Sequence, residues 1–474
     1  MIRMTDAQTH LWGTASNGGT ADTGTIFVAN IDGSNLHKVH SFAAPFGANP
    51  EGAMVLANNG KFYGVTFYGG TCGGHGVAYT YNPISGIYND IYNFFCTTQN
   101  GWLVYSGPML AVDGEIYGLT TLGGSNGFGG VIYRIDPATN IYSVVYKFVD
   151  TVGSSAGINP EGTLIQLSDG KLYGMTIQGG EYDVGVIFSF NPSDSAYTEL
   201  HSFDKAAGAR PSYGSLLKAT DGKLYGMTGG GGPDSVGVIF SYDVSTNVYT
   251  DVHNFDTTHG AFPDGSLIQA TNGLLYGMTS HGGANNAGVI FSFDISTNTF
   301  TDLFNFDTLH GINPTRSLMQ ASNGLLFGTT YFGGINGDGV FFSFNTTTNT
   351  YTVLYNFDGG LNGGNPLSDI VEEPDSLTMS GIETITYNKG IGIYPNPTSG
   401  AFTLSYNSQL SILNSQFKIY DVTGREVYSQ PSRLNRDNQE STIINVSNLS
   451  NGIYYWEMKS NNGIEGKGKL AVIK

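Results

Sequence analysis

One sequence motif, an apolar residue followed by an aromatic residue and a glycine, recurs seven times along this chain. The first interval between the motif glycines is 51 residues (64 − 13), and the last two are also 51 (277 − 226 and 328 − 277). A fixed period of this length is the signature of a repeat architecture, so the repeat constrains the fold more than any other feature. The seven copies are Leu11-Trp12-Gly13, Phe62-Tyr63-Gly64, Ile116-Tyr117-Gly118, Leu172-Tyr173-Gly174, Leu224-Tyr225-Gly226, Leu275-Tyr276-Gly277 and Leu326-Phe327-Gly328.

Two further motifs follow in each repeat at a constant spacing. Gly-Val-Ile-Phe or a close variant, as in residues 237–240, precedes an Asn-Phe-Asp motif, as in residues 254–256. The distance from the glycine of the first to the phenylalanine of the second is 18 residues in every repeat (for example 255 − 237 and 42 − 24). Such a constant distance predicts a fixed hairpin inside each unit.

Each unit contains four short strand patterns and no helical period. The first three span residues 265–270, 274–279 and 289–294 in one copy, and the fourth spans 351–357 in the last copy. An Asn-Gly or Asp-Gly pair separates the first two patterns. It predicts a two-residue type I′ hairpin, because these residues tolerate positive φ angles. The pairs are Asn59-Gly60, Asp113-Gly114, Asp169-Gly170, Asp221-Gly222, Asn272-Gly273 and Asn323-Gly324.

Four antiparallel strands per unit predict an all-β fold, a seven-bladed β-propeller over residues 1–371. A linear β-solenoid would have shorter repeats, and the kelch repeat has a similar period but lacks the Asn-Phe-Asp motif. The first copy begins at its second strand, because nothing before Leu11 matches the first-strand pattern well. Residues 365–371 resemble the stretch 159–165 that leads into a first strand. We therefore expect a strand near Ile370 to complete the first blade; a strand from an upstream stretch is the alternative.

The seven units resemble the GloVer tandem repeat over about residues 9–371. This family occurs on proteins with varied surface anchors and has no generally assigned activity. The resemblance therefore implies a fold but no reaction.

A second set of motifs occupies the C-terminal part of the chain. Polar residues 372–389 are predicted to form a linker, and residues 390–474 resemble the type A sorting domain of the type IX secretion system of Bacteroidota. Their alternating strand patterns predict a small immunoglobulin-like β-sandwich, and an ordinary accessory sandwich is the alternative. The residues that carry the resemblance are Tyr394, Pro395, Asn396, Pro397, Gly400, Asp421, Gly424, Gly452, Tyr454 and Lys469.

The resemblance to a sorting domain implies secretion or display at the outer-membrane surface. Its implied partners are the type IX secretion machinery and the processing enzyme that removes the C-terminal domain. It also implies an N-terminal signal peptide, but residues 1–13 contain no apolar segment of that kind. A truncated start and a sorting domain that is not used would each explain this difference.

The charge of the chain restricts the kinds of partner that it can bind. The net charge of −18 with only 20 Lys and Arg residues makes nucleic acid or an anionic membrane surface an unsuitable partner. No run approaches 18 apolar residues, so we predict no transmembrane segment, and we expect a monomer.

Cys72 and Cys96 lie in one repeat, and a local disulfide and two free thiols are equal alternatives.

Ligand-binding residues are expected on the face that carries the connections between blades. These connections vary in length (277 − 255 = 22, but 174 − 148 = 26), which is typical of tolerant, ligand-facing loops. A tryptophan or tyrosine there could stack on a sugar ring; local packing between blades is the alternative for each residue. The candidates are Trp102, Tyr105, Arg210, His259, His281, His310 and Arg316.

Acidic residues recur at two positions of the repeat. Asp150, Asp204, Asp256, Asp307 and Asp358 end the fourth strands, and Glu51, Glu161 and Asp264 precede the first strands at matching positions. A ring of carboxylates could hold Ca²⁺. A repeated aspartate after a strand more often forms a turn, which is the interpretation we favour, and no other cofactor is indicated.

These observations favour a secreted or surface-displayed binding module for a glycan or another surface polymer. The nine histidines are scattered, and no metalloprotease or serine-hydrolase motif is present. An extracellular polysaccharide- or peptide-acting hydrolase or lyase at the channel mouth is the alternative, which clustered carboxylates on that face would favour. A spacer with no specific ligand is a third interpretation.

Overall fold

The computed structural model describes residues 9–373 except 126 and 150–155, and, in the C-terminal part, the segments 391–394, 401–406, 416–420, 425–431, 441–449, 452–460 and 463–472. The chain divides into two compact units, residues 1–375 and 376–474. Each unit is described by itself.

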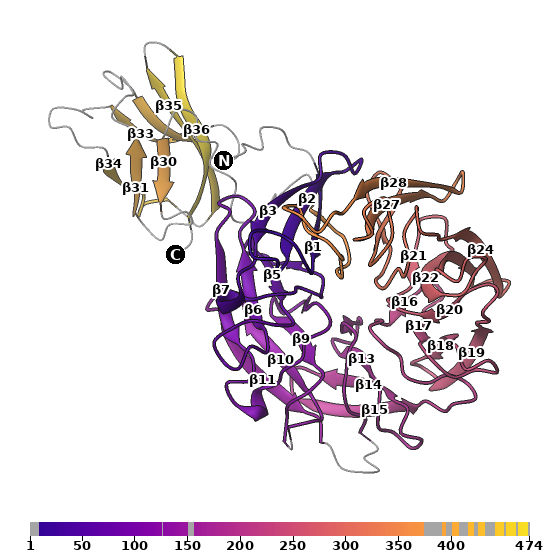
Figure 1. Ribbon diagram of the computed structural model, residues 1–474. Coiled ribbons are helices and arrows are strands. Elements are labelled where there is room, and N and C mark those ends of the chain that lie inside the picture. The colour runs from indigo at the N-terminus through magenta and orange to yellow at the C-terminus, as the bar shows by residue number, and fades with distance from the viewer. Residues whose placement is uncertain are drawn as a thin grey trace. The chain divides into compact units, whose positions relative to one another are not determined.

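The first unit is a β-propeller, which confirms the predicted fold. Seven antiparallel sheets follow one another in chain order around a ring (Figure 1). The strands of a blade are called a, b, c and d from the axis outward. The b–c loops and the d–a connections between blades share one face of the ring, called the loop face. The a–b and c–d turns form the opposite face.

The strand bounds repeat closely from blade to blade. Blade 1 contains β29 (Val371–Glu373), β1 (His10–Ala15), β2 (Thr25–Asn30) and β3 (His37–Ser41); blade 2 contains β4 (Val55–Leu56), β5 (Phe62–Val65), β6 (Val77–Tyr81) and β7 (Tyr88–Asn93); blade 3 contains β8 (Met109–Leu110), β9 (Ile116–Thr120), β10 (Val131–Asp136) and β11 (Ile141–Lys147). Blade 4 contains β12 (Ile165–Gln166), β13 (Leu172–Thr176), β14 (Val186–Asn191) and β15 (Ala196–Ser202); blade 5 contains β16 (Leu217–Lys218), β17 (Leu224–Thr228), β18 (Val238–Asp243) and β19 (Val248–Asn254). Blade 6 contains β21 (Ile268–Gln269), β22 (Leu275–His281), β23 (Val289–Asp294) and β24 (Thr299–Asn305), with β20 (Ala261–Pro263) beside β22; blade 7 contains β25 (Met319–Gln320), β26 (Leu326–Thr330), β27 (Val340–Asn345) and β28 (Thr350–Asn356). Two 3-10 turns, η1 (Ala44–Phe46) and η2 (Thr98–Asn100), lie in d–a connections.

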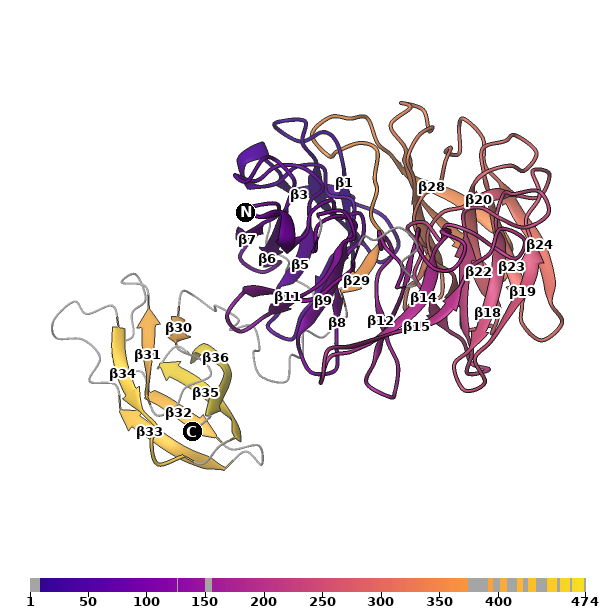
Figure 2. The same ribbon diagram turned by 90° about the horizontal axis from the view of Figure 1, so that it is seen from below.

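The first blade is closed by a strand from the end of the propeller sequence, as predicted. Strand β29 pairs antiparallel with β1, with Val371 opposite Trp12, and appears in orange among the indigo and purple strands in Figure 2. The Trp12 indole Nε1 also donates a 2.7 Å hydrogen bond to Glu373. The strand includes Glu372 and Glu373, two residues that the sequence assigned to the linker. β29 thus covers the edge of β1 that would otherwise be open.

The a–b turns differ from the predicted type I′ hairpins. In blade 6, Ala270 accepts a hydrogen bond from the Gly273 amide and donates one to the Leu274 carbonyl, which encloses a three-residue loop. Only the glycine of the Asn272-Gly273 pair has a positive φ, whereas a type I′ turn needs positive φ at both positions. Asn272 instead accepts a hydrogen bond from the Leu274 amide and donates one to the Tyr276 hydroxyl. These side-chain bonds explain the asparagine or aspartate at this position.

The glycine of the aromatic-Gly motif is required by packing. A Cβ on Gly277 would lie 2.6 Å from the ring of Phe291, the phenylalanine of the Gly-Val-Ile-Phe motif in the adjacent strand. The two motifs therefore recur together because one provides the space that the other fills.

Stacked ring pairs join successive blades along their d strands. His253 of blade 5 lies 4.1 Å from Phe300 of blade 6, with an interplanar angle of 5°. Six of the seven blade junctions carry such a pair, with centroid distances from 3.8 to 4.6 Å. The pairs are His40–Tyr88, Tyr92–Tyr142, Tyr146–Tyr197, His201–Tyr249, His253–Phe300 and Phe304–Tyr351.

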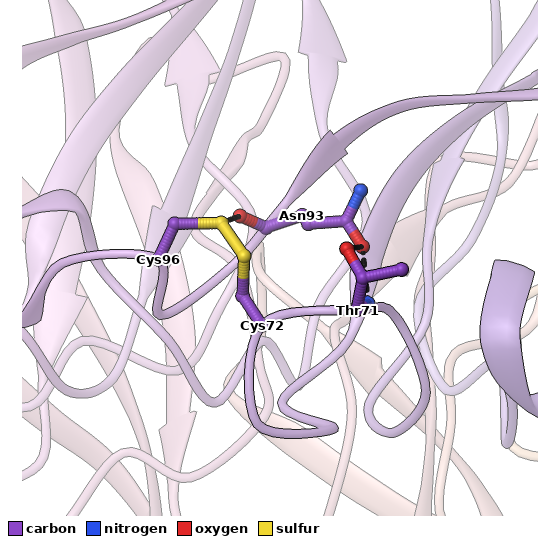
Figure 3. The surroundings of a disulfide bond; sticks show 4 residues. All are labelled: Thr71, Cys72, Asn93 and Cys96. Carbon is purple, nitrogen blue, oxygen red and sulfur yellow. Dashed lines mark hydrogen bonds between the residues drawn. A yellow bond between two sulfur atoms is a disulfide. The ribbon is translucent and has the colours of Figure 1, made fainter.

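A disulfide connects Cys72 in the b–c loop of blade 2 to Cys96 in the following d–a connection (Figure 3). The two Cα atoms are 4.9 Å apart. The Asn93 side chain accepts a 2.6 Å hydrogen bond from the Thr71 amide beside it. The structure thus selects the disulfide from the two alternatives that the sequence left open.

The second unit contains two antiparallel sheets. One has three strands, β30 (Ile391–Tyr394), β31 (Ala401–Tyr406) and β34 (Ser441–Asn445); the other has four, β33 (Glu426–Pro431), β32 (Gln416–Tyr420), β35 (Gly452–Ser460) and β36 (Gly463–Val472). Buried Phe417 and Trp456 stack at 5.7 Å, and Ile419 and Ile444 are buried as well. This all-β arrangement agrees with the predicted fold class.

Candidate functional site

Six side chains from six different blades line the mouth of the central channel on the loop face. Five of them lie four residues before the first residue of their a strand (for example 165 − 161 = 4), and the sixth lies three before it (319 − 316 = 3). Equivalent positions in a ring of blades lie around one axis, so these side chains approach one another. We call them the axial cluster: Glu51, Tyr105, Glu161, Tyr213, Asp264 and Arg316.

Arg316 connects the acidic and the aromatic parts of the axial cluster. Its guanidinium Nη2 lies 3.8 Å from the Glu51 carboxylate, and its Cζ lies 5.3 Å from the centroid of the Tyr213 ring. Tyr213 packs against Tyr105 at 5.4 Å, and Tyr105 packs against Phe67 at 4.9 Å. A carboxylate, a cation and three aromatic rings therefore form one continuous series of contacts.

Several polar atoms of this cluster are buried without a hydrogen-bond partner. Arg316 is only 7% exposed, and its Nε has no partner; neither has Oδ1 of Asp264. The Oγ1 atom of Thr315, next to Arg316, is also without one. Because a buried polar group without a partner is costly, such groups mark a strained site or a place where a ligand completes the bonding.

The carboxyl groups of the axial cluster hold protons unusually tightly. Burial raises the pKa of Glu51, Glu161 and Asp264 to about 7 each. The Asp264 and Glu51 carboxylates raise the pKa of Glu161 further, whereas Arg316 lowers it. These groups therefore change between hydrogen-bond acceptor and donor near neutral pH.

A series of hydrogen bonds joins neighbouring blades one or two residues after the positions of the cluster. The backbone amides of Thr163, Ser215 and Ser266 each donate to the hydroxyl of the equivalent serine in the next blade, at 2.8–3.1 Å. The Ser317 amide donates to the Asp369 carboxylate at 2.6 Å. These bonds link five successive blades next to the axial cluster.

Of the seven predicted ligand residues, two belong to the axial cluster: Tyr105 and Arg316. Trp102 packs instead against His75 at 4.8 Å and Phe95 at 5.2 Å, beside the disulfide, and its buried Nε1 has no hydrogen-bond partner. His281 ends strand β22 and contacts the edge of the Phe262 ring at 5.7 Å. Arg210 is exposed on the loop face, in the left-handed conformation (φ 53°).

His259 and His310 occupy equivalent turns in neighbouring blades. Their Nδ1 atoms lie 3.0 Å and 2.9 Å from Asp256 and Asp307, which also accept hydrogen bonds from backbone amides of the turn. Asp204 and Asp358 accept backbone amides in the same way. The turn-forming interpretation of the repeated aspartates is therefore confirmed at these four positions, and Asp150 lies outside the described residues.

The calcium ring has no support in this geometry. Within the described part of the chain, no three acidic, histidine or cysteine side chains converge closely enough to hold a metal ion. The matching positions of Glu51, Glu161 and Asp264 instead produce an electrostatically coupled group that also contains Arg316.

Exposed aromatic rings concentrate on the loop face. Among the residues whose side chains are described, six phenylalanines or tyrosines are between 43% and 58% exposed, and all six lie in b–c loops or d–a connections. They are Phe46, Tyr68, Phe128, Tyr182, Phe262 and Phe332. Aromatic faces of this kind are common contacts for ligands that are apolar on one side.

Sequence reasoning missed Tyr213 and Phe67. Tyr213 lies in a d–a connection with one extra residue, yet it has the same four-residue distance to its a strand as Tyr105 (217 − 213 = 4). Counting backward from the a strands would therefore have found it.

Few of the sorting residues can be located. Pro395, Asn396, Pro397, Gly400, Asp421 and Gly424 lie outside the described residues. Tyr394 ends β30, Gly452 begins β35, and Lys469 lies in β36. Tyr454 is 9% exposed in β35. The described residues include no helix long and apolar enough to cross a membrane.

Two protein families match the chain. The Gloeobacter/Verrucomicrobia repeat matches residues 2–156, 95–270 and 215–394, and the secretion system C-terminal sorting domain matches residues 392–473. No curated protein is matched.

Several solved structures resemble the chain to different degrees. A candidate 6-phosphogluconolactonase from Bacteroides fragilis is 15% identical with a TM-score of 0.53, over 79% of this chain and all of its own. TolB from Acinetobacter baumannii is 18% identical with a TM-score of 0.40, over 62% of this chain and 63% of its own. PorZ, a surface component of the type IX secretion system of Porphyromonas gingivalis, is 12% identical with a TM-score of 0.43, over 96% of this chain and 64% of its own. The chain thus spans less than two thirds of the TolB and PorZ chains. At these identities, the first similarity shows the fold alone, and the other two carry no argument.

Proposed function

Since the chain belongs to the Gloeobacter/Verrucomicrobia repeat family and carries a secretion system C-terminal sorting domain, we propose that it is a surface or secreted module that binds a glycan at its axial cluster. The sorting domain makes it a propeller protein exported by type IX secretion. The binding activity, its ligand and removal of the domain by a processing enzyme are parts of the proposal.

One observation carries the proposal: a buried arginine without a partner at Nε lies among three carboxyl groups and two tyrosines at the channel mouth. Sugar hydroxyls both donate and accept hydrogen bonds, so they suit a site that offers both kinds of partner. Aromatic rings next to such groups provide faces for the C–H side of a sugar ring. Tyr105 and Tyr213 supply these rings inside the mouth, and Tyr68 and Phe332 supply them outside it.

Neutral sugars fit the charge of this site better than acidic ones. Three carboxyl groups face one guanidinium, and the whole chain carries a net charge of −18. An anionic sugar would be repelled wherever these carboxyl groups are ionised.

A glycan array probed with the folded, full-length protein tests the proposal. We expect saturable binding to neutral glycans, lost in Tyr213→Ala and retained in Val112→Ala on the opposite face. Trp102→Ala and His259→Ala test the outer candidates separately. Absence of binding by folded wild-type protein would contradict the proposal.

The clustered carboxyl groups favour a second candidate, a glycan-cleaving hydrolase or lyase. A carboxyl group with a pKa of about 7 can act as a general acid at neutral pH, and glycosidases use pairs of such groups. Release of reducing ends from polysaccharides, abolished in Glu161→Gln, would support this candidate. Binding without turnover would support the binding module.

A further inference from the structure

The b–c loop of blade 5 contains two glycines that the fold does not require. Gly229 and Gly230 have φ angles outside the left-handed region, unlike the following Gly231 and Gly232 at 80° and 77°. A Cβ on Gly229 would have its nearest neighbour at 3.4 Å, and one on Gly230 at 3.5 Å, which are ordinary contacts. Glycine has more conformational freedom in the unfolded chain than other residues, and it loses this freedom on folding, so it lowers the stability of the folded state. Two glycines that the backbone does not require therefore need another explanation.

Other blades carry side chains at the position of Gly230. This residue forms a bridge with Ala209 of the preceding d–a connection, and the same bridge recurs around the ring. The equivalent pairs are Ala48–Tyr68, Trp102–Leu122, Ile158–Gln178, Ala261–His281 and Ile312–Phe332. Tyr68 and Phe332 are 54% and 46% exposed, so the loop face bears an aromatic ring here in blades 2 and 7 and a gap in blade 5.

The gap lies beside the axial cluster. The neighbours of a Cβ on Gly229 would be the Arg210 carbonyl, the Ser212 hydroxyl at 3.5 Å and the Pro263 carbonyl at 3.9 Å. Ser212 and Pro263 directly precede Tyr213 and Asp264, two members of the cluster. We call this gap the blade 5 notch.

Exposed residues flank the blade 5 notch on both sides. Arg210, whose carbonyl accepts a 3.0 Å hydrogen bond from the Gly229 amide, has an exposed side chain. On the other side, Phe262 is 43% exposed and contacts the ring of His281. The notch thus leads outward from the channel mouth between a cation and an aromatic ring.

We propose that the blade 5 notch is an extension subsite, which holds the second and further residues of a neutral oligosaccharide whose end lies in the axial cluster. This inference rests on the proposed function and adds the substrate class, a chain of several neutral sugars. The unpartnered Arg316 Nε and Asp264 Oδ1 atoms mark the inner end of the subsite. The missing side chains leave the path of the sugar chain open. The Ser212 hydroxyl, which donates to the Arg210 carbonyl, and the Pro263 carbonyl can accept hydrogen bonds from sugar hydroxyls.

Titration of the full-length protein with neutral oligosaccharides of one to six residues tests the inference. The probes are the laminari-, cello-, xylo- and malto-oligosaccharide series, and the readout is calorimetry. We expect the affinity for at least one series to rise with chain length. Gly230→Tyr should remove that rise, with a loss of about tenfold for the hexasaccharide and little change for the shortest ligand that binds.

Gln178→Tyr is the matched control, because it places the same ring at the equivalent exposed position of blade 4. It should bind like the wild type, and both variants should keep the wild-type melting temperature. Length-dependent binding that Gly230→Tyr leaves unchanged would overturn the extension subsite alone. If no series binds the folded wild type, the neutral-oligosaccharide inference is overturned. If the same sample still binds glycans on the array, the proposed function survives; if it binds none, the proposed function fails as well.

Discussion

Arg316 and Glu51 lie 3.8 Å apart although they come from the seventh and second blades, with the first blade between them. The pair therefore spans the place of blade 1 in the ring, and Arg316 is the only cation among the six residues of the axial cluster. We expect Arg316→Met to lower the free energy of unfolding by about 3 kcal/mol at pH 8, because it leaves buried carboxylates uncompensated. The loss should be smaller at pH 5, where the carboxyl groups are protonated.

Urea denaturation at the two pH values measures this effect. Arg210→Met is the control, because this arginine is exposed on the same face and should change stability by less than about 0.5 kcal/mol. Equal losses at both pH values for the Arg316 variant would contradict the charge argument.

Glu161→Gln should change how stability depends on pH. Folding raises the pKa of this carboxyl from 4.5 to about 7, so the folded state binds the proton more tightly. The resulting stability is complete below pH 4.5 and is lost as the pH rises through 7. Relative to wild type, we expect the variant to gain about 2–3 kcal/mol between pH 4.5 and pH 8. Glu181→Gln, at an exposed site, should follow the wild-type profile in the same urea titrations.

His253→Phe should stabilise the propeller in acid. Burial against Phe300 lowers the pKa of this imidazole from 6.5 to about 4, so folding favours the neutral ring. That contribution is present above pH 6.5 and is lost as the pH falls toward 4. Allowing for solvent screening of a partly exposed group, we expect a gain of about 1 kcal/mol at pH 5 and almost none at pH 8.

The next blade supplies a precedent for this variant, because Phe304 holds the equivalent position and stacks on Tyr351 at 4.1 Å. Thermal unfolding at pH 5 and pH 8 is the measurement. A gain of equal size at both pH values would show that ring packing, and not protonation, is responsible.

The sequence predicted the blade and its closure because their causes are local. Gly277 and Phe291 are in contact across adjacent strands, and the equivalent contact recurs in every blade, so the two motifs leave a periodic signal in the sequence. The type I′ turn was wrong because Asn272 bonds to Leu274 and Tyr276, and the dipeptide alone does not show these partners.

The candidate site was only partly predictable, because it depends on distances across the ring. Glu51, Glu161 and Asp264 were recognised at matching positions, but nothing local showed that Arg316 would lie among them. His259 and His310 were selected as unusual residues, yet each contacts an aspartate three residues earlier in its own turn. The blade 5 notch is a pair of missing side chains, which only comparison with the neighbouring blades makes visible.

Replacing Cys72 and Cys96 together by serine should weaken blade 2. The disulfide closes a segment with a sequence separation of 24, for which chain entropy gives about 3 kcal/mol. We expect a loss of that order in chemical denaturation, and wild-type protein treated with a reductant should lose the same amount. A reductant effect on the double variant would show that something other than this disulfide responds.

Shortening the chain at two points tests the closure of the ring. A chain that ends after Ile370 lacks β29 and should show fast amide exchange in β1 and a loss of stability above about 3 kcal/mol, because blade 1 loses its inner strand and the Trp12–Glu373 hydrogen bond. A chain that ends after Asp375 keeps these contacts and should unfold like the first unit of the intact protein. Identical behaviour of the two chains would contradict a closing role for β29.

The position of β29 also sets the order of events during synthesis. A ribosome makes the chain from its N-terminus, so β1 waits with an open edge until six further blades and residue 373 have been added. Blade 1 therefore lacks its inner strand for most of translation. If the processing enzyme of the proposed function removes the C-terminal domain, we expect it to cut beyond Glu373, because a cut before this residue would remove β29 together with the sorting domain.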